Sequence, residues 1–236
     1  MKVKICGITR LEDAEAAAEA GAWAIGLNHS SESPRQVDLD VAEEIGRRLQ
    51  RRVEVAGVFV NAPIDDIVLA AERERLTLVQ LHGEEGPSFC AEVGRKTGCK
   101  VIKAFRVKSP GDVSGARAYK TDFHLFDAFA RGAHGGTGRT FDWELVSTRR
   151  GGPPALLAGG LDPDNVGEAI DAAWPWGVDV ASGVETAPGI KDPNRIVSFV
   201  EAARRAGVAQ QEVREHRRAL KQVRREVAKR SRAAGG

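Results

Sequence analysis

A cysteine near the N-terminus is the first residue of this sequence whose position suggests chemistry. Residues 3–6 form a short apolar run that ends in Cys6, Gly7 follows, and residues 11–20 form an Ala-rich amphipathic segment. Cys6 is therefore expected where a buried strand opens into a loop, the usual place for a catalytic side chain in a parallel α/β fold. Taken alone, a cysteine at a strand end is more often a small apolar packing residue.

Other polar residues follow apolar runs in the same way. Asp127 ends the run 123–127, Arg35 follows a Ser-Pro pair, and His82 follows the run 76–81. On residue type alone, such an aspartate is as often a helix cap as an acid, and such an arginine is most often solvated. The histidine is at least as often held by neighbouring loops as in contact with a ligand. If all these strands share one sheet, the residues face one mouth, where chemistry is expected.

Glycine-bearing loops follow three of the later apolar runs. Backbone N–H groups in such loops can approach phosphate oxygens closely, because glycine has no Cβ atom. A glycine pair alone more often marks a tight turn, but three such loops on successive strand ends favour a phosphate site. The residues concerned are Gly135, Gly136 and Gly138, then Gly159 and Gly160, then Ser182 and Gly183.

The elements that must position these residues alternate regularly along the chain. Apolar runs predict strands at 3–6, 23–27, 53–60, 76–81, 100–105, 123–127, 155–158 and 178–181. Segments with helical periodicity follow them at 11–20, 39–49, 64–73, 87–97, 111–118, 141–148, 163–173 and 193–205. Short, almost wholly apolar strands with no hairpin between them indicate a parallel sheet covered by helices. Eight such units predict an α/β fold of the (β/α)8 TIM-barrel type, with a doubly wound open sheet as the alternative.

Composition is that of an ordinary globular protein. Of 236 residues, 42% are hydrophobic and 29% are charged, and the three cysteines show no CxxC pair or His/Cys spacing. We therefore expect no disulfide framework and no zinc site, and a cytoplasmic protein. No apolar stretch is long enough for a transmembrane helix, and no signal peptide is recognisable.

The charge is distributed unevenly. The total is +2, but residues 207–236 contain nine Lys and Arg against three Glu, a net charge of +6, which leaves −4 for the rest. We predict a barrel domain over residues 1–206 and a basic C-terminal extension, helical or partly disordered, over residues 207–236. A solvated helix is the simplest interpretation of the extension, and an arm that binds a polyanion is the alternative.

A series of short motifs between residues 2 and 205 has the composition and order of a known family. They are Lys4-Ile5-Cys6-Gly7-Ile8-Thr9, Ser33-Pro34-Arg35, Gly57-Val58-Phe59-Val60-Asn61, Gln80-Leu81-His82-Gly83-Glu84, Gly135-Gly136-Thr137-Gly138, Ala158-Gly159-Gly160-Leu161 and Val178-Asp179-Val180-Ala181-Ser182-Gly183-Val184-Glu185. Each motif alone is weak, but together they are specific. The chain resembles the phosphoribosylanthranilate isomerases, enzymes of tryptophan biosynthesis on a (β/α)8 barrel.

The resemblance implies an Amadori rearrangement of N-(5-phosphoribosyl)anthranilate to 1-(2-carboxyphenylamino)-1-deoxyribulose 5-phosphate. An acid protonates the furanose oxygen to give a Schiff base, and a base removes the C2′ proton to give an enolamine, with no metal or organic cofactor. By this resemblance Cys6, as a thiolate, is the general base and Asp127 the general acid. Arg35 matches the residue that binds the anthranilate carboxylate, and Gly136, Gly138, Gly159, Gly160, Ser182 and Gly183 match the phosphate loops. His82 is assigned only a substrate contact.

The segment after Gly26 departs from the family pattern. Residues 27–32 are largely polar where the family usually has apolar and aromatic residues, and Ala181 replaces a usual serine. Two alternatives therefore stand beside the leading hypothesis. One is an isomerase of a related phosphoribosyl amine, and the other is a non-catalytic barrel that binds a sugar phosphate. The presence of both Cys6 and Asp127 favours an enzyme, because a binding protein needs neither proton-transfer group.

Overall fold

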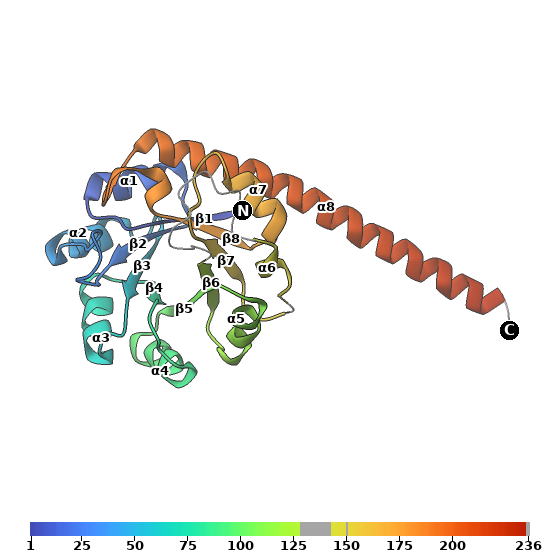
Figure 1. Ribbon diagram of the computed structural model, residues 1–236, viewed down its shortest axis with the longest axis horizontal. Coiled ribbons are helices and arrows are strands. Elements are labelled where there is room, and N and C mark those ends of the chain that lie inside the picture. The colour runs from blue at the N-terminus through green and yellow to red at the C-terminus, as the bar shows by residue number, and fades with distance from the viewer. Residues whose placement is uncertain (128–142, 150, 235–236) are drawn as a thin grey trace.

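The computed structural model describes residues 1–127, 143–149 and 151–234, with only the backbone described at 214 and 216–234. Eight parallel strands form a closed barrel in the order β1 to β8, as the sequence predicts (Figure 1). The strands are β1 (Lys2–Cys6), β2 (Ala24–Asn28), β3 (Glu54–Phe59), β4 (Leu78–Leu81), β5 (Lys100–Arg106), β6 (Phe123–Asp127), β7 (Ala155–Ala158) and β8 (Gly177–Val180).

Helices surround the barrel and connect its strands (Figure 1). They are α1 (Leu11–Ala20), α2 (Leu39–Leu49), α3 (Ile64–Arg73), α4 (Pro87–Thr97), α5 (Pro110–Gly115), α6 (Glu144–Ser147), α7 (Val166–Ala173) and α8 (Pro193–Ala234). The alternation of β-branched runs with helical periodicity therefore locates every strand and the helix that follows it. No helix among the described residues is both long and apolar enough to span a membrane.

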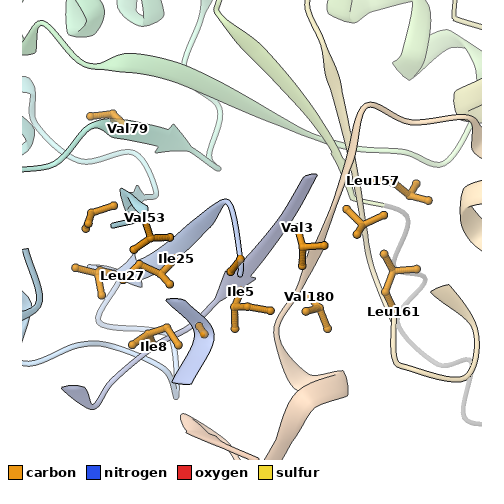
Figure 2. Packing of buried hydrophobic residues seen from close by; sticks show 14 of the residues in the cluster. Val3, Ile5, Ile8, Ile25, Leu27, Val53, Val79, Leu157, Leu161 and Val180 are labelled. Atoms are coloured by element: carbon orange, nitrogen blue, oxygen red, sulfur yellow. The ribbon is translucent and has the colours of Figure 1, made fainter. Parts of the chain in front are cut away.

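Side chains alternate between the two faces of each barrel strand, and this alternation separates core from site. Val3 and Ile5 point outward into the apolar layer between strands and helices, which also contains Ile8, Ile25 and Val180 (Figure 2). Lys4 and Cys6, which alternate with them, face the barrel interior. The lower interior is apolar, and Trp23, Phe123 and Trp176 pack against one another there.

A small antiparallel hairpin that the sequence analysis did not predict follows β8. It consists of β9 (Glu185–Ala187) and β10 (Ile190–Lys191), outside the barrel sheet. Its turn is Pro188-Gly189, with Gly189 at φ 80°, a left-handed conformation that glycine adopts without strain. Thr9 Oγ1 donates to the Gly189 carbonyl at 2.5 Å and so attaches the hairpin to the β1–α1 loop. The Pro-Gly pair was the signal for this turn.

The last helix has two parts with different surroundings. Ile196, Phe199, Val200 and Ala203 are buried, where α8 packs against α1 and α7. The helix then continues without interruption past residue 206 and projects from the barrel (Figure 1). The division into a barrel domain and a basic extension stays a prediction, and the backbone of the extension is helical to Ala234.

The close approach of α2 to the end of α3 depends on a glycine and can be tested by its replacement. A Cβ atom at Gly46 in α2 would collide with the backbone carbonyl oxygen of Glu74. Because the colliding atom belongs to the backbone, the clash cannot be relieved by a side-chain rotation. We expect Gly46→Ala to lower the free energy of unfolding by about 1–3 kcal/mol, because the two helices must move apart. Urea denaturation followed by circular dichroism measures this change.

Gly167 in α7 provides the matched control, since a Cβ atom there would meet nothing within 4 Å. Gly167→Ala should raise the free energy of unfolding by about 0.5–1 kcal/mol, through the higher helix propensity of alanine. If Gly46→Ala and Gly167→Ala changed the free energy of unfolding equally, the contact between α2 and α3 would not require a glycine at position 46.

Candidate functional site

A cavity of about 390 Å³ opens at the carboxyl ends of the barrel strands. Because parallel strands of a closed barrel all end at one face, residues that follow different strands meet there. The lining includes seven of the residues predicted from sequence: Cys6, Arg35, His82, Asp127, Gly159, Gly160 and Ser182. Gly136 and Gly138, also predicted, lie outside the described residues.

Cys6 ends β1 and is half-buried at the floor of the cavity. Its backbone carbonyl accepts a hydrogen bond from Lys191 Nζ at 2.6 Å. Burial raises the pKa of the Cys6 thiol, the positive charge of Lys4 acts in the opposite direction, and the negative charge of Asp179 adds to the rise. The thiolate of such a cysteine is a strong base, whose population depends on the cations around it.

Asp127 ends β6 and lines the same cavity as Cys6. Its carboxylate Oδ2 lies 3.5 Å from His82 Nε2. The other ring nitrogen of His82, Nδ1, lies 3.1 Å from the amide Nε2 of Gln80. With that amide as donor, Nδ1 is the acceptor and Nε2 carries the proton that faces Asp127. His82 therefore contacts the predicted acid, and it also lines the cavity where a substrate contact was expected.

Arg35 approaches the cavity from the loop after β2 and forms a bidentate salt bridge with Glu185. Its Nε and Nη2 atoms donate to the two carboxylate oxygens of Glu185 at 2.8 and 2.7 Å. Lys191 Nζ donates to the same carboxylate at 2.8 Å. These two cations outweigh burial and lower the pKa of Glu185, which therefore holds Arg35 as an anion. Sequence reasoning gave Glu185 and Lys191 no role.

The loop that carries Arg35 is held by Asn28, one of the polar residues that depart from the family pattern. The Asn28 amide donates to Ser33 Oγ at 3.0 Å and accepts from the backbone N–H of Ser30 at 2.9 Å. Ser33 Oγ in turn accepts the backbone N–H of Arg35 at 3.1 Å. Both polar atoms of the Asn28 side chain are thus engaged within its own loop, and they fix the position from which Arg35 extends.

The loops after β7 and β8 meet beside the cavity. Gly159 and Gly160 have φ values of 97° and 64°, which a residue with a side chain rarely adopts. Gly183 lies in a short 3-10 helix, Ser182–Val184, and a Cβ atom there would collide with the carbonyl oxygen of Leu161. Glycine thus lets these two loops approach each other closely, as the expected phosphate loops must.

Two buried charges at the cavity, Lys4 and Asp179, were missed from the sequence, and Asp179 is part of the cavity lining. Lys4 is fully buried, and its Nζ atom lies 2.9 Å from Asp179 Oδ1. A charged residue inside an apolar strand was the available signal, because such residues are almost never buried without a partner. Among the described residues, no group of three or more His, Cys, Asp or Glu side chains is arranged to hold a metal ion.

Comparison with known proteins relates the chain to an enzyme family. Residues 3–202 match the family model described as N-(5'phosphoribosyl)anthranilate (PRA) isomerase. An N-(5'-phosphoribosyl)anthranilate isomerase of Geobacter sp. strain M21 is 47% identical over 204 residues, which cover 86% of this chain and 98% of the relative.

Solved structures agree. The crystal structure of phosphoribosyl anthranilate isomerase from Thermotoga maritima is 39% identical, with a TM-score of 0.76 over 86% of this chain and 98% of that chain. A phosphoribosyl anthranilate isomerase in complex with reduced 1-(o-carboxyphenylamino)-1-deoxyribulose 5-phosphate is 37% identical, with a TM-score of 0.74 and the same coverage. On the match to residues 3–202 and the identity to relatives over most of its length, this chain belongs to the N-(5'-phosphoribosyl)anthranilate isomerase family.

Proposed function

We propose that this protein is an isomerase that converts N-(5-phosphoribosyl)anthranilate to 1-(2-carboxyphenylamino)-1-deoxyribulose 5-phosphate, a step of tryptophan biosynthesis. The observation that carries the proposal is that Cys6 and Asp127, from strands β1 and β6, line one cavity together with Arg35. The solved relative with a reduced form of that product supports the same substrate class.

In the proposed reaction the two proton-transfer groups act in turn. Asp127, in its protonated form, gives a proton to the furanose ring oxygen, and the ring opens to a Schiff base. The Cys6 thiolate then removes the C2′ proton, which leaves an enolamine that tautomerises to the aminoketose. Substrate and product are isomers, so no atom or electron has to be supplied from outside. Proton transfer of this kind contributes roughly 10²- to 10⁴-fold to a rate.

Arg35 would bind the anthranilate carboxylate. Glu185 occupies the edge of the guanidinium formed by Nε and Nη2. The edge formed by Nη1 and Nη2 has a geometry that a second carboxylate can accept, since a guanidinium presents five N–H donors in a fixed plane. Glu185 on one edge thus orients Arg35 for a substrate carboxylate on the other.

The phosphate would lie at the loops after β7 and β8, with Gly159, Gly160, Ser182 and Gly183. Support comes from the left-handed backbone at Gly159 and Gly160, which line the cavity, and from the close packing of Gly183 against Leu161 beside it. This position corresponds to the phosphate site that recurs after the last strands of such barrels. Gly136 and Gly138 are proposed to contribute from the preceding loop.

The role of Asn28 favours anthranilate over a different amine. The polar segment after β2 raised that alternative, but the Asn28 amide is engaged with Ser33 and Ser30 in its own loop. Asn28 can therefore be explained by its role in supporting the loop of Arg35. It does not require a substrate with a different polar group. A non-catalytic sugar-phosphate-binding barrel is less consistent with this cavity, which has both a cysteine and an aspartate in its lining.

Two further proposals concern cellular context. A reducing cytoplasm is the proposed location, since Cys6, Cys90 and Cys99 are all free thiols.

The basic extension, residues 207–236, is proposed to bind a polyanion. Support comes from its net charge of +6 and from the backbone of α8, which carries it away from the barrel as a single helix (Figure 1).

The proposed acid and base can be tested with freshly prepared N-(5-phosphoribosyl)anthranilate, whose fluorescence disappears on conversion. Cys6→Ala and Asp127→Asn should each lower kcat/KM by roughly 10²- to 10⁴-fold, while the fold is retained. Cys99→Ala is the matched control, a cysteine of similar exposure outside the cavity, and should leave turnover unchanged. Near-normal turnover of either first variant would remove that residue from the mechanism. No acceleration by the folded wild type would contradict the proposed substrate.

The proposed carboxylate contact predicts a different kinetic pattern at Arg35. Arg35→Ala should raise KM by ~10- to 100-fold with a smaller effect on kcat, because a charge-assisted hydrogen-bonded pair with the substrate is lost. Arg35→Lys retains the charge but not the planar fork and should recover only part of the loss. Steady-state kinetics separate the two parameters, and an unchanged KM in Arg35→Ala would place the carboxylate elsewhere.

For the extension, the expected result is salt-dependent binding that needs its positive charge. Removal of residues 216–236 should weaken binding to double-stranded DNA, used as a model polyanion, by at least ~10-fold at low salt without loss of isomerase activity. Fluorescence anisotropy at about 50 and 200 mM salt measures this. A full-length control with Arg217, Arg218, Arg224 and Arg225 each changed to Gln should show the same loss. Equal binding by all forms would mean that the extension is only a solvated helix.

A further inference from the structure

Lys4 is a fully buried cation inside the barrel, two residues before Cys6 on the same face of β1. Its Nζ atom lies 2.9 Å from Asp179 Oδ1 on the neighbouring strand β8. Buried ion pairs of this kind are seldom net stabilising, because removing both charges from water offsets most of their attraction. Fold stability alone therefore gives no good reason for a lysine here.

A glycine on β2 shows where the lysine and the cysteine meet. Gly26 pairs with Cys6 in the parallel register of β1 and β2. A Cβ atom at Gly26 would lie 2.8 Å from Cys6 Sγ and 2.9 Å from Lys4 Nζ. The sulfur and the ammonium nitrogen thus flank the same small space, which exists because residue 26 has no side chain. This juxtaposition places a permanent positive charge beside the sulfur.

We propose that Lys4 is a positioning residue for the isomerase reaction, whose buried ammonium stabilises the Cys6 thiolate, while Asp179 limits how much of that charge the sulfur receives. The inference rests on the proposed role of Cys6 as the base. Lys4 is fully buried and does not itself line the cavity, but its neighbours Cys6 and Asp179 do. Lys4 therefore acts on the substrate only through these neighbours.

The other charged groups around Cys6 are engaged differently. Lys191 Nζ donates to the carbonyls of Cys6 and Ala181 and to Glu185, which accounts for its three N–H bonds. Arg35 is paired with Glu185, and His82 and Asp127 contact each other across the cavity. Among the described cations near the sulfur, Lys4 is the one whose partner is a single carboxylate, that of Asp179.

The directions of the pKa shifts agree with this arrangement. The negative charges of Asp179 and Cys6 outweigh burial and raise the pKa of Lys4, so that Lys4 stays protonated throughout the working range and does not compete as a base. For the Cys6 thiol, Lys4 lowers the pKa and Asp179 raises it. Loss of Lys4 should therefore move the thiol pKa upward, and loss of the Asp179 charge should move it downward.

The experiment measures the rate of Cys6 alkylation by iodoacetamide as a function of pH, with the modified peptides resolved by mass spectrometry. Lys4→Met together with Asp179→Asn removes both charges and leaves no unpaired ion. The two losses act in opposite directions, but Lys4 lowers the pKa of the Cys6 thiol by both its charge and a hydrogen bond, so the midpoint of the Cys6 profile should still move up. We expect a shift of about half a pH unit, which corresponds to about 3-fold slower alkylation well below the midpoint. Cys99, which has no contact with Lys4, is the internal control in every sample and should not shift.

Asp179→Asn alone provides a second test, because it keeps Lys4 and should shift the Cys6 alkylation midpoint in the opposite direction. Its Cys6 midpoint should move down, and Lys4→Arg should stay close to the wild type. The acid limb of the pH profile of kcat/KM should move with the alkylation midpoint in each variant. A merely structural lysine would change the amount of folded protein without moving either midpoint.

The outcomes separate this inference from the proposed function. An unchanged Cys6 midpoint in the folded double variant, or a downward shift in it, would overturn the role of Lys4. The same follows if Asp179→Asn moves the midpoint upward. If the midpoints shift as expected but Cys6→Ala retains normal isomerase turnover, the stabilisation of the thiolate by Lys4 stands and the proposed role of Cys6 as the base fails.

Discussion

One buried carboxylate, that of Glu185, joins the parts of the cavity that come from distant regions of the chain. It accepts two hydrogen bonds from Arg35, 150 residues earlier, and a third from Lys191. Lys191 in turn donates to the carbonyls of Cys6 and Ala181, at the ends of β1 and β8. The first and last strands of the barrel, the loop of Arg35 and the hairpin after β8 are thus held by one network. Its geometry sets the distance between Cys6, the proposed base, and Arg35, the proposed ligand of the substrate carboxylate.

A second lysine–glutamate pair plays the same part on the other side of the mouth. Lys103 Nζ donates to Glu85 at 2.7 Å, and Glu85 accepts the backbone N–H groups of Asn61 and Gly83 at 2.8 Å each. The loops after β3 and β4 are therefore fixed next to His82, which contacts Asp127. Apolar residues would stabilise the fold at least as well as such buried pairs. Their value lies in holding loops in one conformation, which the proposed acid and base, Asp127 and Cys6, require in order to act on one substrate.

The sequence predicted most of the fold because its local signals agree with one another. Each short apolar run ends at a polar or glycine residue and is followed by a helical segment, so all eight units and the mouth residues could be located. The hairpin Glu185–Lys191 was missed because its strands are too short for a periodic pattern. Arg35 could be predicted as a residue of the cavity, but its partner Glu185 could not, since only barrel closure brings them together. Lys4 was passed over because a single lysine inside an apolar run does not show from the sequence whether its side chain is buried with a partner.

The register between β1 and β2 explains why Cys6, the proposed base, is positioned by strands and not by a flexible loop. The Gly26 carbonyl accepts the backbone N–H groups of both Gly7 and Ile8 at 3.0 Å, which fixes the turn directly after Cys6. The absent side chain of Gly26 leaves the space flanked by Cys6 Sγ and Lys4 Nζ. Any larger residue there would displace the sulfur or the cation, or break the strand pairing. The same glycine therefore serves the backbone geometry and the electrostatics of the base, so a substitution at this position would act on both at once.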